Sequence, residues 1–133
     1  MEKARQYSAL SLLSLGVLAA GSAIAQQVAT LPSGLEVQLI EVRLDDELEL
    51  GRFRLLAPAL GEPGVDLDAL RPDFDQICAE LALPFMAARQ PAWRDVVISL
   101  SASVIPFGET DPGVVQAFES YSLEGEDCIW QDF

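Results

Sequence analysis

The sequence has 133 residues, with 8 Lys and Arg against 21 Asp and Glu, no His and 2 Cys. This length suits one domain. The net charge of −13 argues against nucleic acid and anionic lipid as partners, because binding to phosphates depends on Lys and Arg. The absence of His removes the commonest general base and the commonest transition-metal ligand.

The beginning of the chain has the three parts of a secretory signal peptide. A positively charged start is followed by an apolar stretch over residues 10–20 and by an A-x-A cleavage site that ends at Ala25. The alternative is a retained membrane anchor, but a spanning helix needs about 20 apolar residues. We therefore expect residues 1–25 to be removed, leaving 26–133 as one compact domain in the periplasm or outside the cell, without membrane insertion.

The expected mature chain is acidic and contains no lysine. Removing two cations and one acid with the leader reduces the totals of 8 and 21 to 6 arginines and 20 acids. Schiff-base chemistry and a P-loop lysine are therefore excluded. The sequence contains no cofactor motif, and we expect no cofactor.

Cys78 and Cys128 are the only cysteines, and both lie in the part that we expect to be exported. Disulfides persist in such compartments, so we predict a bond between these two residues. On the chain-entropy model it would close a loop of about 50 residues and stabilise the fold by about 4 kcal/mol. Two free buried thiols, or reactive thiols, are the alternatives. The expected mature chain has no His or Lys to stabilise a thiolate, and two Cys without His cannot form a zinc site.

The first half of the expected domain predicts a β-hairpin. A short lead-in over residues 26–33 ends in a turn signal. Residues 35–44 then alternate between apolar and polar side chains. The alternation slips after Leu39, which indicates a β-bulge. Residues 48–57 alternate again, with Gly51 as a candidate second bulge.

The segment 65–82 contains one main predicted helix. Its apolar residues recur with the spacing i, i+3, i+4 and i+7 of a core-facing stripe: Phe74, Ile77, Cys78 and Leu81. Pro72 suits the first helical position, and we expect Pro84 to end the helix.

The second half predicts a central strand, a short helix and a hairpin. Residues 94–102 are apolar and β-branched, as in a buried strand. Asp111 and the proline after it favour a short helix over 113–118, and residues 119–123 and 128–131 flank an acidic turn. The predicted fold is α+β, in the order β-β-α-β-α-β-β. It has a small antiparallel or mixed sheet of about five strands with the main helix packed on one face.

The clearest candidate binding residues are arginines and aromatics. Arg52 and Arg54 share one face of the strand over 48–57, with Arg43 on the neighbouring strand, so their forked donors would grip an anionic ligand. The alternative is cross-strand pairing with nearby carboxylates: Glu36, Glu41 or Glu49.

Four aromatic residues are candidates for lining an exposed groove for a peptide or glycan: Trp93, Phe107, Tyr121 and Trp130. The alternative is that they belong to the core or cover it. Trp93 and Phe107 lie in proline-rich irregular segments, where side chains are more easily exposed. We therefore predict that these two residues, with Arg52 and Arg54, form the binding surface.

The acidic residues offer two weaker hypotheses. A Ca²⁺ site would draw on four carboxylates that also suit a helix start: Asp66, Asp68, Asp73 and Asp75. A small carboxylate-dependent hydrolase would use a pair from three acids: Glu109, Asp111 and Glu119. We expect no metal site, because the acids do not fit an EF-hand pattern and because capping and the helix dipole favour acids at a helix start without a metal. We expect no catalytic residues, because the serines lack a His or Lys partner and no pair of acids stands out from the many present.

Several short runs resemble an uncharacterised family of small exported proteins from marine alphaproteobacteria. They lie at residues 31–37, 57–60, 97–100, 106–109 and 128–130. The resemblance implies a saline Gram-negative host and residence in the periplasm, and it supplies no catalytic residues. We therefore predict a non-enzymatic periplasmic interaction module, whose partner could be another periplasmic protein.

Overall fold

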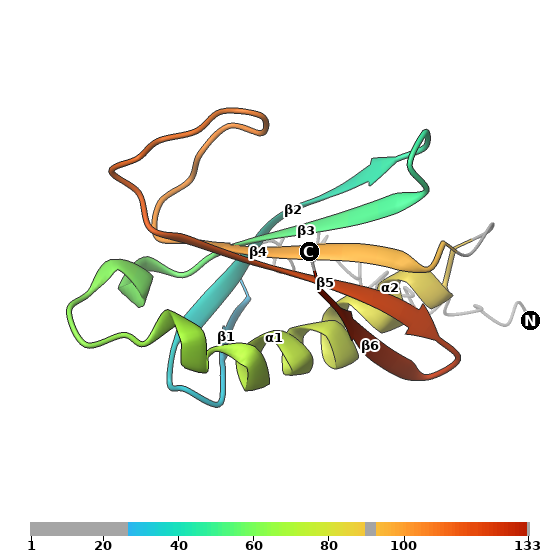
Figure 1. Cartoon of the computed structure of the whole chain (residues 1–133), viewed down its shortest axis with the longest axis horizontal. Helices are drawn as coiled ribbons and strands as arrows, with labels where there is room; N and C mark the ends of the chain where they lie inside the picture. The colour runs from blue at the N-terminus through green and yellow to red at the C-terminus, as the bar shows by residue number, and fades with distance from the viewer. Residues whose placement is uncertain (1–26, 90–92, 133) are drawn as a thin grey trace, which may run out of the picture.

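The computed structural model describes residues 27–89 and 93–132. One mixed sheet contains six strands in chain order: β1 (Val28–Thr30), β2 (Glu36–Asp45), β3 (Leu50–Leu56), β4 (Asp95–Ser101), β5 (Gln116–Glu124) and β6 (Asp127–Gln131). Neighbouring strands are antiparallel except β3 and β4, which are parallel. The helical segment that joins β3 to β4 crosses one face of the sheet (Figure 1), and the sheet curls as a half-barrel.

The predicted α+β class is confirmed, but the order of elements is β-β-β-α-β-β-β. The short lead-in over 26–33, for which no strand was predicted, contains the strand β1, which pairs with β2. Three residues are too few for alternation to be read from sequence. The hairpin of β2 and β3 is confirmed, together with the bulge, since the register shifts between Leu39 and Glu41.

The prediction of a second bulge at Gly51 is wrong, because β3 keeps a continuous register through this residue. Gly51 is needed for space instead. A Cβ atom there would lie 2.9 Å from Sδ of Met86, which packs onto the sheet from the helical segment. The missing side chain therefore lets this segment approach β3 closely.

The prediction that Pro84 ends the helix is also wrong. The helical path runs from α1 (Arg71–Ile77) through a π-helical turn (Cys78–Ala82) into α2 (Leu83–Ala87). In the wider turn, the amide of Leu83 donates to the carbonyl of Cys78. The change of winding places Pro84 in the first turn of α2, where its missing N–H costs little.

The predicted short helix over 113–118 does not form. The amide of Gly113 donates to Oδ1 of Asp111 at 2.9 Å and the amide of Val114 donates to its carbonyl at 3.0 Å, which closes a turn. Strand β5 then begins at Gln116 and pairs with the whole of β4. The Asp-Pro start suits a turn as well as a helix, and so short a helix would be marginal without packing.

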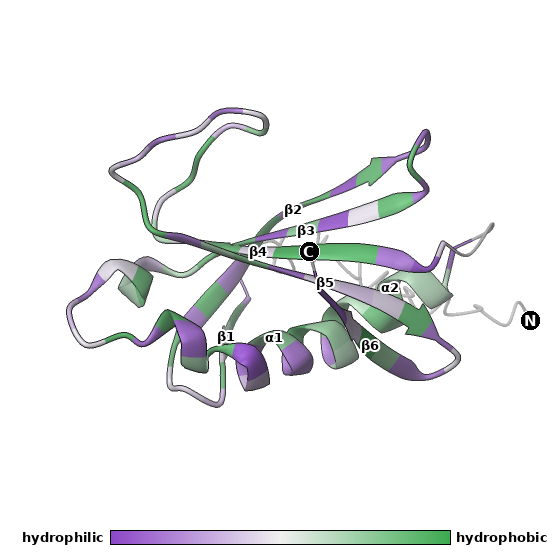
Figure 2. Ribbon diagram, viewed as in Figure 1, coloured by the Kyte–Doolittle hydropathy of each residue, from purple (hydrophilic) through white to green (hydrophobic). Residues whose placement is uncertain are grey.

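The core lies between the helical segment and the sheet face that it covers, which we call the helix face. Figure 2 shows hydrophobic and hydrophilic residues alternating along β2 and β3. The strands bury their apolar set on this face: Val37, Phe53, Leu55, Val96, Ile98, Leu100, Tyr121 and Leu123. The helical segment contributes the apolar residues Phe74, Ile77, Cys78 and Met86.

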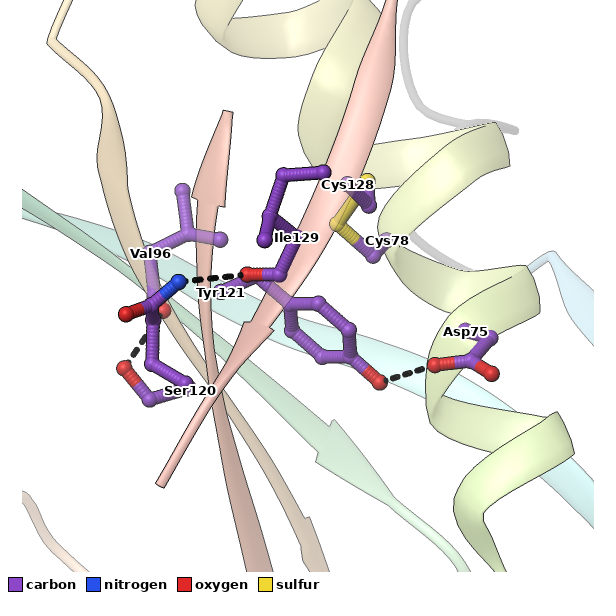
Figure 3. The surroundings of a disulfide bond; sticks show 8 residues. Asp75, Cys78, Val96, Ser120, Tyr121, Cys128 and Ile129 are labelled. Carbon is purple, nitrogen blue, oxygen red and sulfur yellow. Dashed lines mark hydrogen bonds between the residues drawn. A yellow bond between two sulfur atoms is a disulfide. The ribbon is translucent and has the colours of Figure 1, made fainter. Parts of the chain in front are cut away.

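Two sets of bonds hold the helical segment to the sheet. The predicted disulfide is confirmed, and it joins buried Cys78 to Cys128 of β6, with 6.3 Å between the Cα atoms. Figure 3 shows Tyr121 reaching from β5 toward α1, where its hydroxyl donates to Oδ1 of Asp75 at 2.6 Å. At the other side, buried Asp73 accepts from the amide of Ser33 at 2.9 Å and from its hydroxyl.

Candidate functional site

The face of the sheet that the helical segment does not cover, which we call the open face, carries most of the polar strand residues. Because side chains alternate along a strand, the neighbours of core residues point to this face. Cross-strand pairing arranges them in two rows. The rows are Glu41, Arg54, Ser99 and Phe118, and Arg43, Arg52, Val97 and Ser120.

Phe107 lies over the arginines of both rows. The segment 102–115 joins the end of β4 to the start of β5, and it extends on the side of the sheet away from the helices (Figure 1). The ring centroid of Phe107 lies 4.1, 5.6 and 5.8 Å from the guanidinium carbons of Arg43, Arg52 and Arg54. These are cation–π distances. We call these four residues the arginine cluster.

Arg54 connects the cluster to the loop and to the neighbouring strand. Its Nη2 donates to the carbonyl of buried Ile105, and its Nη1 donates to Glu41. The Arg43 guanidinium also lies 3.4 Å from Glu41. The hydrogen bond from Arg54, with the positive charges of both arginines, holds the pKa of Glu41 below its usual value of 4.5.

Arg52 differs from the other two arginines in its partners. Among residues 27–89 and 93–132 it forms no ion pair, and its Nε is buried without a hydrogen-bond partner. Cross-strand pairing with a carboxylate, one of the two predicted alternatives, is found for Arg54, which pairs with Glu41. Arg43 lies near Glu41 on the same strand. The guanidinium of Arg52 is left without a carboxylate partner among the described residues.

A pocket of about 170 Å³ lies beside the cluster on the open face. Strand residues form its floor: Arg52, Arg54, Val97 and Ser99. Two half-exposed rings line it, Phe107 from the loop and Phe118 from β5, with exposed fractions of 47% and 50%. Its other lining residues come from the loop and from the start of β5: Pro106, Gly108, Glu109, Thr110 and Gln116.

The family to which this chain belongs can be stated from comparison with known sequences. The model of a family of unknown function, DUF6497, matches residues 14–133. The chain belongs to the DUF6497 family. No curated protein and no solved structure matched it.

The structure brings together three of the four residues predicted to form the binding surface of this DUF6497 protein. Arg52, Arg54 and Phe107 lie in the cluster, whereas Trp93 lies on the helix face. Trp93 is partly buried against the core and lines a depression with Leu83, Met86 and Leu123. It therefore takes no part in the open-face pocket.

The other two candidate aromatics also contact the helical segment. Tyr121 is buried, and its pKa is raised well above 10 by burial and by its bond to the Asp75 carboxylate. Trp130 donates from Nε1 to Glu119 at 2.6 Å, and its ring lies 3.6 Å from the guanidinium carbon of Arg71. For these two rings the structure favours the alternative of a role in or over the core.

Three of the four carboxylates of the Ca²⁺ hypothesis have separate partners, and Asp68 is exposed. Asp66 accepts from the amide of Asp68 at 3.0 Å, Asp73 binds Ser33, and Asp75 binds Tyr121. Within the described part of the chain, no three Cys, Asp or Glu side chains converge in a way that could hold a metal ion.

The acids of the hydrolase hypothesis lie apart. Glu109 lines the pocket on the open face. Glu119 pairs across strands with buried Ile98 and so points to the helix face. Asp111 closes the turn before β5.

None of the described helices is long and apolar enough to span a membrane.

Sequence reasoning missed Phe118, the second ring of the pocket. The expected helix over 113–118 would have placed it away from Ser99, which it opposes in the sheet. The two β-branched residues shortly before it, Val114 and Val115, favour a strand over a helix.

Proposed function

We propose that this protein is an exported, non-enzymatic binding module, and that its open face contacts an anionic group of its partner. One observation supports this proposal most directly. Three of the 6 arginines that follow the leader gather around one exposed phenylalanine, in a chain of net charge −13.

The charge distribution gives the cluster its selectivity. Acidic groups elsewhere on the surface repel an anionic partner, whereas the cluster attracts it, so the partner would approach in one orientation. Two of the arginines share Glu41, and Arg52 has no ion pair with any other described residue. Guanidinium forks match carboxylates and phosphates in geometry.

The proposal of export depends on the leader sequence and agrees with the disulfide. Disulfides form and persist in the periplasm and outside the cell. The chain recovered from the periplasm of its host should begin at Gln26 and carry no free thiol. A cytosolic chain that keeps its first residue and has two alkylatable cysteines would contradict export.

A hexaglutamate peptide tests the binding proposal, with hexalysine as the comparison. In a two-dimensional NMR titration of residues 26–133, we expect hexaglutamate to shift the open-face resonances around Arg52 and Phe107. The substitution Arg52→Gln should weaken this binding at least about fivefold, since charge-assisted hydrogen bonds are lost. Arg89→Gln is the matched control, because Arg89 is exposed outside the cluster.

Hexalysine should cause small shifts of resonances over much of the surface, because a cationic peptide is attracted by the negative net charge of the protein and not by one site. The proposed anion recognition would be refuted if hexaglutamate left the cluster unperturbed, or if Arg52→Gln and Arg89→Gln had equal effects.

A further inference from the structure

We propose that the open-face pocket takes a small aromatic monocarboxylate, with the carboxylate on Arg52 and the ring between Phe107 and Phe118. This inference rests on the proposed function and names the class of ligand for the same site. It follows from the placement of a guanidinium that forms no ion pair within the described part of the chain beside two exposed rings in a single pocket.

The surroundings of Arg52 set the side from which a carboxylate would approach. Toward the β2–β3 turn, Arg43 and Arg52 share a depression with three acids: Asp45, Asp46 and Glu47. These acids repel an anion on that side. On the other side, the floor beside Arg52 and Arg54 consists of Val97 and Ser99, which carry no charge. A carboxylate is therefore best placed on the Ser99 side.

The two phenylalanines account for the aromatic part of the ligand. Both rings are about half exposed, and a planar ring packed against them would remove apolar surface from water. Val97 supplies an apolar floor beneath. The pocket volume of about 170 Å³ is below the roughly 300 Å³ at which drug-sized pockets begin, so it suits a single ring.

Glu109 opposes this ligand, and its position sharpens the test. Its carboxylate lines the same pocket and would repel a bound anion. Glu109→Gln should therefore strengthen binding of an aromatic carboxylate and leave binding of its uncharged amide unchanged. A role of Glu109 in loop structure alone would affect both ligands equally.

The experiment compares three probes with the protein over residues 26–133: N-acetylphenylalanine, its amide, and acetate. We expect N-acetylphenylalanine to shift the resonances of Arg52, Val97 and Phe118 and to saturate. The amide and acetate should each bind at least about tenfold more weakly, since each lacks one of the two parts. Equal binding of the amide or of acetate, or no saturation with N-acetylphenylalanine, would overturn the proposal.

Matched variants test which residue binds the carboxylate and which residue contacts the ring. Arg52→Gln should abolish the preference for N-acetylphenylalanine over its amide, and Phe118→Ser should weaken both ring-bearing probes. Arg89→Gln should change neither. A preference that survived in Arg52→Gln would contradict the assigned role of Arg52.

The hexaglutamate titration distinguishes failure of this inference from failure of the proposed function. If hexaglutamate binds the cluster while N-acetylphenylalanine binds no better than acetate, anion recognition stands and the aromatic ligand is wrong. If neither probe perturbs the cluster, both proposals are wrong. A pentapeptide ending in phenylalanine that bound more tightly than N-acetylphenylalanine would overturn the assignment to a small free acid.

Discussion

The two faces of the sheet differ in what covers them. The helix face is covered by a continuous helical path that is bonded to it through the Cys78–Cys128 disulfide and the contact between Asp75 and Tyr121. The open face carries charged side chains and two exposed rings. Successive residues of β3 alternate between these environments, since Phe53 is fully buried while Arg52 and Arg54 lie in the cluster.

We attribute stability to the helix face, and we propose recognition for the open face. Alternation of side chains along a strand allows substitution on the open face with little effect on the core. We therefore expect helix-face variants to lose stability. Open-face variants should lose binding with changes in stability of about 0.5 kcal/mol or less.

The largest expected effect follows loss of the disulfide. The double substitution Cys78→Ala and Cys128→Ala removes a link between residues separated by 50 positions. We expect the free energy of unfolding to fall by about 4 kcal/mol, mainly because the unfolded chain is less restrained. Urea denaturation measures this loss, with reduced wild-type protein as a second comparison. A loss below about 1 kcal/mol would mean that the helix face does not depend on the link.

The next largest effect concerns the buried carboxylate of Asp73. Asp73→Ala leaves the amide and hydroxyl of Ser33 without this partner. We expect a loss of about 1–3 kcal/mol in the free energy of unfolding. Asp68→Ala is the control, since Asp68 is exposed at a 3-10 turn, and it should cost less than about 0.5 kcal/mol. If both variants lost the same free energy of unfolding, the cause would be the change in net charge and not the loss of the contact with Ser33.

Alkaline pH should destabilise the helix face through Tyr121. Its pKa is raised in the folded protein above its usual value of 10.0, so folding favours the neutral phenol. The associated stability is present below pH 10 and decreases as pH rises toward the folded pKa. Residues 26–133 contain no lysine and one tyrosine, and both cysteines are bonded, so few other side chains titrate in this range.

Thermal unfolding at pH 9 and pH 11, together with phenolate absorbance, measures this effect. We expect a lower Tm at pH 11 and no phenolate signal before unfolding. The Tyr121→Phe variant should lose most of the pH dependence. A phenol that ionised near pH 10 in the folded protein would contradict the assignment.

The smallest expected effect on stability is at Glu41 on the open face. Its pKa is lowered in the folded protein, chiefly by the hydrogen bond from Arg54. Its contribution is therefore present above the unfolded value of 4.5 and is lost as pH falls through the folded pKa. Glu41→Gln should make unfolding less sensitive to acid and tighten hexaglutamate binding, because one competing carboxylate is removed. Weaker binding in this variant would contradict the role given to the arginines.

Local patterns predicted much of the fold. Alternation located the hairpin and the bulge after Leu39, and the helical stripe placed Cys78 in the core, where the disulfide forms. The predictions were wrong where the local sequence is compatible with more than one backbone structure. Pro84 follows a π-helical turn that no sequence pattern indicated, and the Asp111 turn begins with the same residues as a helix.

Only part of the candidate site was predicted, because only part of it depends on local patterns. Arg52 and Arg54 were recognisable because they alternate with apolar residues in one strand. The position of Phe107 depends on a loop that returns over the sheet, and Phe118 depends on the register of β5 against β4. Both are long-range features, which short-range spacing does not encode.

The most direct test of the division between the two faces is a paired measurement on Arg52→Gln. Denaturant unfolding gives the stability of the variant, and a hexaglutamate titration of the same preparation gives its affinity. We predict a free energy of unfolding within about 0.5 kcal/mol of wild type and binding weakened at least about fivefold. Unchanged binding, or a stability loss above about 2 kcal/mol, would contradict the account.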